Sequence, residues 1–307
     1  MIPRLVRMAC TGCGLGAQHS NFQQKAAALR VLTYMSVNQE AIEQIFSELE
    51  AGANIVNLLS WERNDVVLKE AIGLLVQITL PFIDMKKRKD NRQQDMLRGI
   101  PLKSLVRALT NVARSPCGRE LFLLVTAALA NISFLEADSF RDNETCSTLV
   151  GMSKQRPSLT DDVPLKDQII TVLANIAAHH PLEIISSGGL VYLLSALQLR
   201  PDESVDAVAV ERIQQKTAAA LARLGTHKSC AKLLERLNGI QRLVELCKIP
   251  KLRNYSDTVL LAALAALRRI SSTLGKVPFK QLNALDLVEL ELCDSFVLYS
   301  HKSESYV

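Results

Sequence analysis

Two cysteines near the N-terminus have a spacing that can bind a metal ion. Cys10 and Cys13 are separated by two residues, and His19 follows them. Thiolate and imidazole groups are typical zinc ligands, but a structural zinc site needs four ligands. The sequence has no second Cys or His pair at a suitable spacing, and the glycines at 12, 14 and 16 favour a loop between two helices. We therefore predict no metal site and no cofactor.

The sequence contains no recognisable catalytic constellation. His179 and His180 precede Pro181, where a helix is expected to end, and a polar or cationic side chain is favourable there without any ligand role. A nucleophile elbow, an H-E-x-x-H motif and a P-loop are all missing from the sequence. We therefore predict that the protein is not an enzyme, that it has no catalytic residue and that it takes no small-molecule substrate.

The last four residues have the chemistry of a PDZ ligand. A PDZ domain takes a free C-terminus as an added strand and holds its carboxylate in a backbone nest. Val307 would fill the apolar pocket and Ser305 would offer its hydroxyl, while Glu304 would meet a basic rim and Tyr306 would point outwards. Because the tail is polar and follows a compact domain, we expect it to be reachable and residue 307 to be the natural C-terminus.

A second set of candidate binding residues recurs at one position of a Leu-x-X-(Ile/Leu) pattern. Asn at this position could hydrogen bond both the N–H and the C=O of an extended peptide, and Arg toward the C-terminal half would suit an acidic segment. Only two positions carry Asn, so a complete peptide ladder is not expected. The alternative is that these polar side chains only solvate an inner face. The predicted residues of this concave groove are Gln77, Asn131, Asn175, Arg223, Arg268 and Arg269.

These positions require a long helix that recurs along the chain. Its pattern occurs six times, at intervals of 44 to 54 residues. Small residues in each copy would let neighbouring repeats stack, while Leu and Ile fill the shared core. The leading residues of the six copies are Leu29, Leu75, Leu129, Leu173, Leu221 and Leu267.

An apolar pair in a shorter amphipathic segment precedes each long helix. Four of these segments follow a glycine, which a sharp corner between helices needs for its positive φ and close backbone approach. Each unit is therefore predicted as a short helix, a corner, a medium helix, a loop and a long helix. The apolar pairs are Leu5-Val6, Ile55-Val56, Leu105-Val106, Leu149-Val150, Leu193-Leu194 and Leu243-Val244. The corner glycines are Gly52, Gly99, Gly189 and Gly239.

Three helices per unit with a glycine corner resemble armadillo repeats rather than two-helix HEAT repeats. Residues 188–197 resemble the armadillo second helix, and Leu-Ala-Asn-Ile at 129–132 and at 173–176 resembles the third. We predict an all-α fold, an armadillo-type right-handed α-solenoid of about six three-helix repeats. The solenoid is expected to span residues 1–275, followed by a capping segment over 276–299 and a flexible tail over 300–307 with the PDZ ligand at its end.

The composition agrees with a helical, reduced, intracellular protein. Hydrophobic residues make up 48% and charged residues 22% of the 307 residues, which excludes wholesale disorder. The seven cysteines are odd in number and scattered, as in a cytosolic protein. No uninterrupted apolar run reaches the roughly 18–20 residues that span a bilayer. The net charge of +5 would suit an acidic partner but is too small to indicate nucleic-acid binding.

Three departures from the regular repeat stand out. The chain begins with the pattern of the second helix of a repeat, without a first helix before it. We therefore expect either a form of a longer protein that starts in mid-repeat, or an uncapped end of the solenoid that a partner covers. The second interval, from Leu75 to Leu129, is stretched to 54 residues and contains the basic run 86–89. This run is either an import signal or acidic-partner contact, or simply a solvated loop within residues 83–96. A second loop is expected over 153–164.

Armadillo repeats of irregular length, mild basicity and a C-terminal Glu-Ser-Tyr-Val together resemble the C-terminal armadillo domain of Inscuteable, an adaptor of asymmetric cell division. The resemblance implies a cytoplasmic scaffold, located at the cell cortex, that joins polarity proteins to spindle-orientation machinery. Its implied partners are a PDZ-containing polarity scaffold like Bazooka and, through a peptide that lies N-terminal to the family's repeats, Pins (LGN in vertebrates). Ser305 and Val307 would belong to the PDZ ligand.

Two other functions fit the same residues. A general armadillo adaptor of nuclear transport or of cell junctions would use the groove without the tail. An armadillo-type regulator of another enzyme would act through loops such as 83–96 or 153–164. Binding of purified PDZ domains to the tail would separate the first interpretation from both alternatives.

Overall fold

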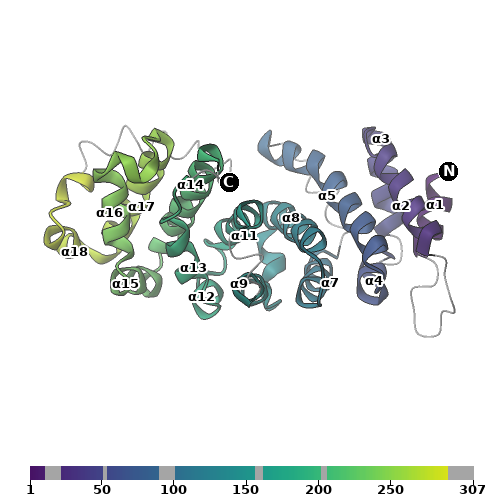
Figure 1. Ribbon diagram of the computed structural model, residues 1–307, viewed down its shortest axis with the longest axis horizontal. Coiled ribbons are helices and arrows are strands. Elements are labelled where there is room, and N and C mark those ends of the chain that lie inside the picture. The colour runs from purple at the N-terminus through teal and green to yellow at the C-terminus, as the bar shows by residue number, and fades with distance from the viewer. Residues whose placement is uncertain (11–21, 51–53, 90–100, 156–161, 202–205, 290–307) are drawn as a thin grey trace. The chain divides into compact units, whose positions relative to one another are not determined.

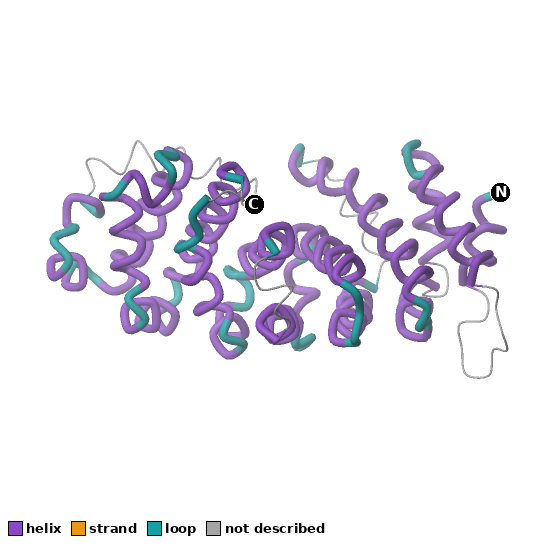
Figure 2. The backbone as a smooth tube through the Cα atoms, viewed as in Figure 1, coloured by secondary structure: helices purple, strands orange, loops and turns teal. Residues whose placement is uncertain are grey.

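The computed structural model describes residues 1–10, 22–50, 54–89, 101–155, 162–201 and 206–289. These residues form helices joined by turns, and no strand occurs among them (Figure 2). The helices group into two compact units, Met1–Thr148 and Leu149–Val307. The predicted all-α fold of armadillo type is confirmed.

Each repeat contributes one long helix, and these long helices pack together as the core of each unit (Figure 1). In the first unit α5 contacts both α2 and α8, and in the second unit α14 contacts both α11 and α17. The leading leucines of all six repeats have at most 2% of their surface exposed, so their predicted burial is confirmed. The long helices are α2 Phe22–Met35, α5 Asp65–Lys87, α8 Arg119–Leu135, α11 Val163–Ile176, α14 Ala207–Gly225 and α17 Asp257–Leu274.

Shorter helices pack against the long ones and carry the apolar pairs. Within the units α1 contacts α2, α7 contacts α8, and α16 contacts α17. The helices with the apolar pairs are α1 Ile2–Cys10, α4 Asn54–Trp61, α7 Leu102–Arg114, α9 Thr145–Gln155, α13 Gly189–Ala196 and α16 Gly239–Lys248. The remaining elements are α3 Gln39–Glu50, α12 Pro181–Ser186, α15 Lys228–Arg236 and α18 Val277–Gln281, with 3-10 turns η1 Ala137–Phe140, η2 Pro250–Arg253 and η3 Leu285–Leu287.

Two described corners, between α12 and α13 and between α15 and α16, use two residues each. The positive φ belongs to Gly188, at 74°, and to Asn238, at 57°. The glycine that follows supplies the close approach, because a Cβ on Gly189 would lie 2.9 Å from Cγ2 of Ile184. The sequence analysis assigned both the positive φ and the close approach to Gly189 and Gly239. The close approach is confirmed, but the positive φ belongs to the residue before each glycine. The other two predicted corner glycines lie outside the described residues: Gly52 and Gly99.

Polar side chains fix where three of the long helices begin. Asn64 precedes α5, and its Oδ1 accepts hydrogen bonds from the N–H groups of Val66 and Val67 at 3.0 and 3.3 Å. Asp162 before α11 and Ser256 before α17 accept one such bond each. The first N–H groups of a helix have no partner inside it, so these caps satisfy them and set the start of the helix.

Helix α5 is longer than the sequence pattern indicates. Lys86 and Lys87 form its last turn, so the basic run expected in a loop begins on a helix. Nζ of Lys86 donates hydrogen bonds to the carbonyl oxygens of Phe134 and Leu135 at 2.7 and 2.9 Å. A cation is favourable at the C-terminus of a helix, here α8, and the contact ties the added turn of α5 to it. Burial lowers the pKa of Lys86.

Other predicted segments also differ in extent. The loop expected over 153–164 is shorter, because α9 continues to Gln155 and α11 begins at Val163. In the capping segment expected over 276–299, the described residues form α18, where Pro278 and Phe279 are buried, and the turn η3. Residues 290–307 lie outside the described residues, so the predicted capping segment and tail remain predictions.

By length and composition alone, helix α5 could cross a membrane. This differs from the expectation that no segment is long and apolar enough. Half of the apolar window in α5 is buried inside the unit, where the helix contacts α2 and α8. A buried core helix passes the same test as a membrane span, so α5 is weak support for membrane insertion.

A buried ion pair connects α2 to the turn before α5. Nζ of Lys25 lies 3.0 Å from Oε2 of Glu62, and only 4% and 13% of the two side chains are exposed. Burial alone would raise the pKa of the Glu62 carboxyl. Hydrogen bonds from the Asn64 N–H, from Lys25 and from the Arg63 N–H outweigh this effect and lower the pKa below its usual value.

We expect Glu62→Gln to reduce the free energy of unfolding at pH 7 by roughly 3 kcal/mol, because it breaks a buried pair. Because the pKa of Glu62 is lower in the folded state than in the unfolded state, its ionised form stabilises the protein at pH values above the unfolded-state pKa of 4.5. This stabilisation is lost as the pH falls through the folded-state pKa. The difference between parent and variant should therefore vanish in acid. Urea unfolding between pH 7 and pH 3 measures it, and a difference independent of pH would contradict it. Glu120→Gln, which removes the exposed partner of Lys69, is the control and should change little.

Candidate protein-binding surface

The predicted groove residues all lie on long helices. Each side chain is partly exposed, as expected for a position between the core and solvent. In the first unit they are Gln77 on α5 and Asn131 on α8, and in the second unit they are Asn175 on α11, Arg223 on α14, and Arg268 and Arg269 on α17.

Asn131 uses its amide to contact the preceding long helix. Its Nδ2 lies 3.3 Å from the carbonyl oxygen of Val76 and 2.8 Å from Oγ1 of Thr79, both on α5. The carbonyl of Val76 directly precedes Gln77, the equivalent position of the earlier repeat. The amide donors of Asn131 therefore connect two repeats, which leaves the side-chain oxygen as the atom with capacity for a ligand N–H.

Arg223 makes the equivalent contact in the second unit. Its Nη1 donates to the carbonyl oxygen of Ala174 at 2.6 Å, one residue before Asn175 and close to the end of α11. A guanidinium is favourable at a helix C-terminus. A guanidinium has five N–H donors in a fixed plane, and the bond to this carbonyl uses one of them.

Two further basic residues lie on the same side of α14. Lys216 and Arg212 are seven and eleven residues before Arg223, so helical periodicity places all three on one stripe. Both contact the single carboxylate of Asp167 on α11, Lys216 Nζ at 2.9 Å and Arg212 Nε at 2.9 Å. Lys216 also donates to Oγ1 of Thr171 at 2.7 Å.

Sequence reasoning missed this stripe. The single carboxylate of Asp167 contacts two cations, so Arg212 and Lys216 together keep an excess of positive charge. Arg212 is about half exposed at its side chain, which makes it accessible from solvent. The signal that could have found the stripe is the seven- and eleven-residue spacing of basic residues before Arg223 on one predicted helix. We call Arg212, Lys216 and Arg223 the α14 basic stripe.

The long helices of the first unit have a different surface. Arg30 on α2 pairs with Glu70 on α5, and Lys69 on α5 pairs with Glu120 on α8, so these charges balance. Tyr34 on α2 is 74% exposed, and other exposed apolar side chains are Val31 and Leu80. Among the described residues, the ion pairs between long helices are balanced in the first unit. In the second unit they leave an excess of positive charge.

The other sequence-based site residues fall partly outside the described residues. Cys10 ends α1 and is half-buried, whereas Cys13 and His19 are not among the described residues. Over the described ranges, no group of three or more His, Cys, Asp or Glu side chains is arranged to hold a metal ion. The proposed PDZ ligand, Glu304 to Val307, is also outside them.

Comparisons with known proteins agree with this architecture. The family profile described as "Protein inscuteable C-terminal" matches residues 12–307. A solved crystal structure of an engineered protein, from the Northeast Structural Genomics Consortium, superposes with a TM-score of 0.66 over 89% of this chain and 97% of its own. Its sequence is 20% identical, so it supports the fold alone.

Curated relatives carry the same family name. The human "Protein inscuteable homolog" is 31% identical and the mouse "Protein inscuteable homolog" 32% identical, each over a 297-residue alignment. Both alignments cover 91% of this chain and 48% of the relative. The chain thus spans about half the length of the curated relatives it matches. The resemblance inferred from the armadillo pattern and the last four residues is confirmed: the chain belongs to the inscuteable C-terminal family.

Proposed function

We propose that the protein is a non-enzymatic adaptor that binds polarity and spindle-orientation proteins in asymmetric cell division. The observation that carries the proposal is the α14 basic stripe, where Asp167 balances only part of the charge of Arg212 and Lys216. Membership of the inscuteable family and a solenoid of stacked helices support a binding role. The proposed location is the cytoplasm, at the cell cortex, without membrane insertion or nucleic acid.

In this proposal an acidic, extended segment of a partner lies along the long helices of the second unit. Carboxylates of the segment pair with Arg223 and, on α17, with Arg268 and Arg269, since guanidinium groups recognise carboxylates with two parallel hydrogen bonds. The amide of Asn175 bonds the segment's backbone. Gln77 and Asn131 are proposed to do the same for a segment on the first unit.

The tail provides a second, separate contact. With a free carboxylate at Val307, the residues Glu304, Ser305, Tyr306 and Val307 bind a PDZ domain of a polarity scaffold like Bazooka. Pins is proposed as a further partner of the whole adaptor. The two surfaces would let one molecule hold two proteins together, which is what an adaptor requires.

The charge on the long helices can be tested by reversing it. We expect Arg223→Glu combined with Arg269→Glu to weaken binding of a purified Bazooka-like scaffold or of Pins roughly tenfold or more, because a close charge pair at an interface contributes about 1.5 kcal/mol or more. Isothermal titration calorimetry measures the affinity, and a thermal melt shows whether the second unit stays folded.

Lys232→Glu combined with Arg236→Glu is the matched control. Both residues are exposed on α15, so their reversal changes the net charge by the same four units as the double variant without touching the stripe. Unchanged affinity in the double variant, with an unchanged melting temperature, would rule out the long-helix surface as the partner site. An equal loss in this control variant would mean that only net charge matters.

A further inference from the structure

Arg212 is an exposed member of the α14 basic stripe, and a carboxylate on α11 holds its guanidinium in one orientation. Its Nε donates to Oδ2 of Asp167 at 2.9 Å, and only 9% of the Asp167 side chain is exposed. Because the acceptor is buried on a neighbouring helix, it fixes the plane of the guanidinium before any partner arrives. A fixed guanidinium loses less entropy when it binds a ligand.

Lys216 neutralises most of the charge of Asp167. Nζ of Lys216 lies 2.9 Å from Oδ1 of Asp167, and 18% of its side chain is exposed, against 51% for Arg212. The more buried ion pair is less screened by water and therefore stronger. Lys216 also donates to Thr171, so two of its three donors are used within the fold. Lys216 is thus the structural counter-ion of Asp167, and Arg212 keeps the charge that is left over.

The outer end of the Arg212 guanidinium has no acceptor in the part of the chain that the structure describes. Nε makes its one hydrogen bond there, and Nη1 and Nη2 make none. The acidic residue beside it, Glu211, is engaged elsewhere, because its Oε1 accepts hydrogen bonds from Ser256 and Thr258 of the following repeat. Two parallel N–H groups at the end of a guanidinium match the two oxygens of a carboxylate.

An exposed apolar side chain lies one helical turn before Arg212. Val208 is four residues earlier on α14, so helical geometry places the two residues on one face, and 64% of Val208 is exposed. An acidic side chain can contact both, with its carboxylate on Arg212 and its methylene groups on Val208. A free phosphate ion would contact Arg212 alone. The pair therefore favours an acidic side chain of a protein.

We propose that Arg212 binds a carboxylate of an acidic segment from a partner protein through Nη1 and Nη2, and that Asp167 is its positioning residue. The inference rests on the proposed adaptor function, since the segment belongs to a partner that lies on the long helices. It adds the residue that recognises the carboxylate and the geometry of recognition, which is two parallel hydrogen bonds in the plane of a fixed guanidinium.

Acetylated hexaglutamate is the probe, titrated into the whole chain and followed by NMR of the arginine side chains. Arg212→Lys keeps the charge but loses the planar fork, so we expect roughly tenfold weaker binding, as after loss of a hydrogen bond to a charged group. Arg236→Lys makes the same change at an exposed position on α15 and should bind like the parent. Because Arg212 is half exposed, its variant should melt at the same temperature as the parent.

The NMR signals of Arg212 test the geometry independently of affinity. On binding, its Nη protons should give separate signals, because two hydrogen bonds stop rotation about the Cζ–Nη bonds. The Nε proton is already held by Asp167 and should shift little. In the free chain, Asp167→Ala should speed exchange of this Nε proton with water. Nη signals that stay merged at saturation, or equal Nε exchange in the two chains, would contradict the proposed geometry.

Other outcomes would refute the carboxylate itself. Equal affinity of the parent and Arg212→Lys would show that only charge matters, and equal binding of acetylated hexaglutamine would exclude a carboxylate. Shifts of Arg212 with inorganic phosphate but not with hexaglutamate would assign it to another anion, and no binding of hexaglutamate would also refute the proposal.

Failure of this inference can be told apart from failure of the adaptor function. If the adaptor function fails, the purified scaffold and Pins do not bind the parent chain. If only the role of Arg212 fails, they bind the parent and Arg212→Lys with equal affinity.

Discussion

Leu221→Ala is expected to reduce the free energy of unfolding of the second unit by about 2–5 kcal/mol, the usual range for truncating a buried leucine. Leu221 lies in α14, which contacts both α11 and α17, and its side chain is completely buried. The truncation would leave a cavity at the centre of three stacked long helices. Denaturant unfolding followed by circular dichroism at 222 nm measures the loss.

Leu182→Ala is the matched control for this experiment. Leu182 lies on α12 in the same unit, and 60% of it is exposed. The same chemical change should there cost no more than about 0.5 kcal/mol. Similar losses in the two variants would contradict the assignment of Leu221 to a core shared by neighbouring repeats.

One glycine added after Val307 is expected to abolish binding of a PDZ domain to a chain that otherwise ends at this residue. The extension moves the carboxylate out of its backbone nest and replaces the valine side chain in the apolar pocket by hydrogen. Phosphorylation of Ser305 should act in the same direction, because a group with a charge of about −2 replaces a hydroxyl in a tight site. Fluorescence anisotropy with the purified PDZ domain of the scaffold measures both effects.

Tyr306→Ala should weaken PDZ binding much less, because alternate side chains of a bound strand point to opposite faces and this one points away from the pocket. Binding of partners to the long helices should not change in any tail variant. A glycine-extended chain that bound the PDZ domain as well as the parent would remove the tail from the proposed mechanism and leave the long-helix surface alone.

The core was predictable because it depends on a repeated local pattern. The leucines from Leu29 to Leu267 recur at one helical position, and burial of that position in one repeat implies burial in all of them. The corners were predictable only in part. Two consecutive glycines, Gly188 and Gly189, stand at one corner, and a sequence alone does not say which takes the positive φ and which allows the close contact.

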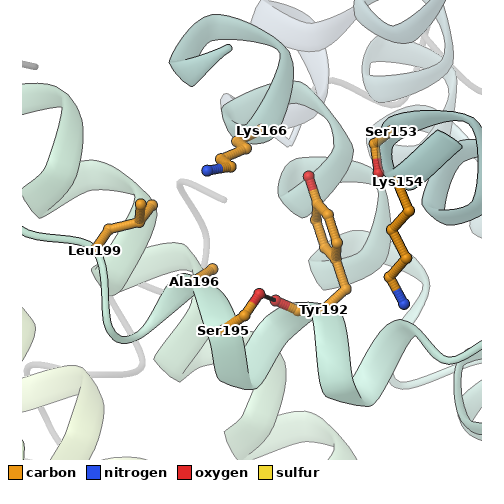
Figure 3. A pocket seen from close by; sticks show the side chains of 7 residues that line it. All are labelled: Ser153, Lys154, Lys166, Tyr192, Ser195, Ala196 and Leu199. Carbon is orange, nitrogen blue, oxygen red and sulfur yellow. Dashed lines mark hydrogen bonds between the residues drawn. The ribbon is translucent and has the colours of Figure 1, made fainter. Parts of the chain in front are cut away.

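The candidate site was less predictable because its contacts connect residues that are far apart in the sequence. The position of Asn131 was evident, but its bonds to Val76 and Thr79 depend on how α8 packs on α5. The last turn of α5 depends in the same way on the bond from Lys86 to the end of α8. A cavity of about 270 Å³ in the second unit has no local sequence signal, since Tyr192 and its other lining residues lie on three separate helices and a turn (Figure 3).

The direction of two inter-repeat bonds, those from Asn131 and Arg223, has a consequence for biosynthesis. Asn131 and Arg223 both donate to carbonyl groups that come earlier in the chain, by 55 and 49 residues. When a ribosome releases either donor, the helix that carries its acceptor has already been made. Until the donor has been synthesised, water can hydrate each carbonyl acceptor. An incomplete chain therefore has no buried donor without a partner at this position. At these two positions the later repeat can therefore close on a neighbour that has already been synthesised.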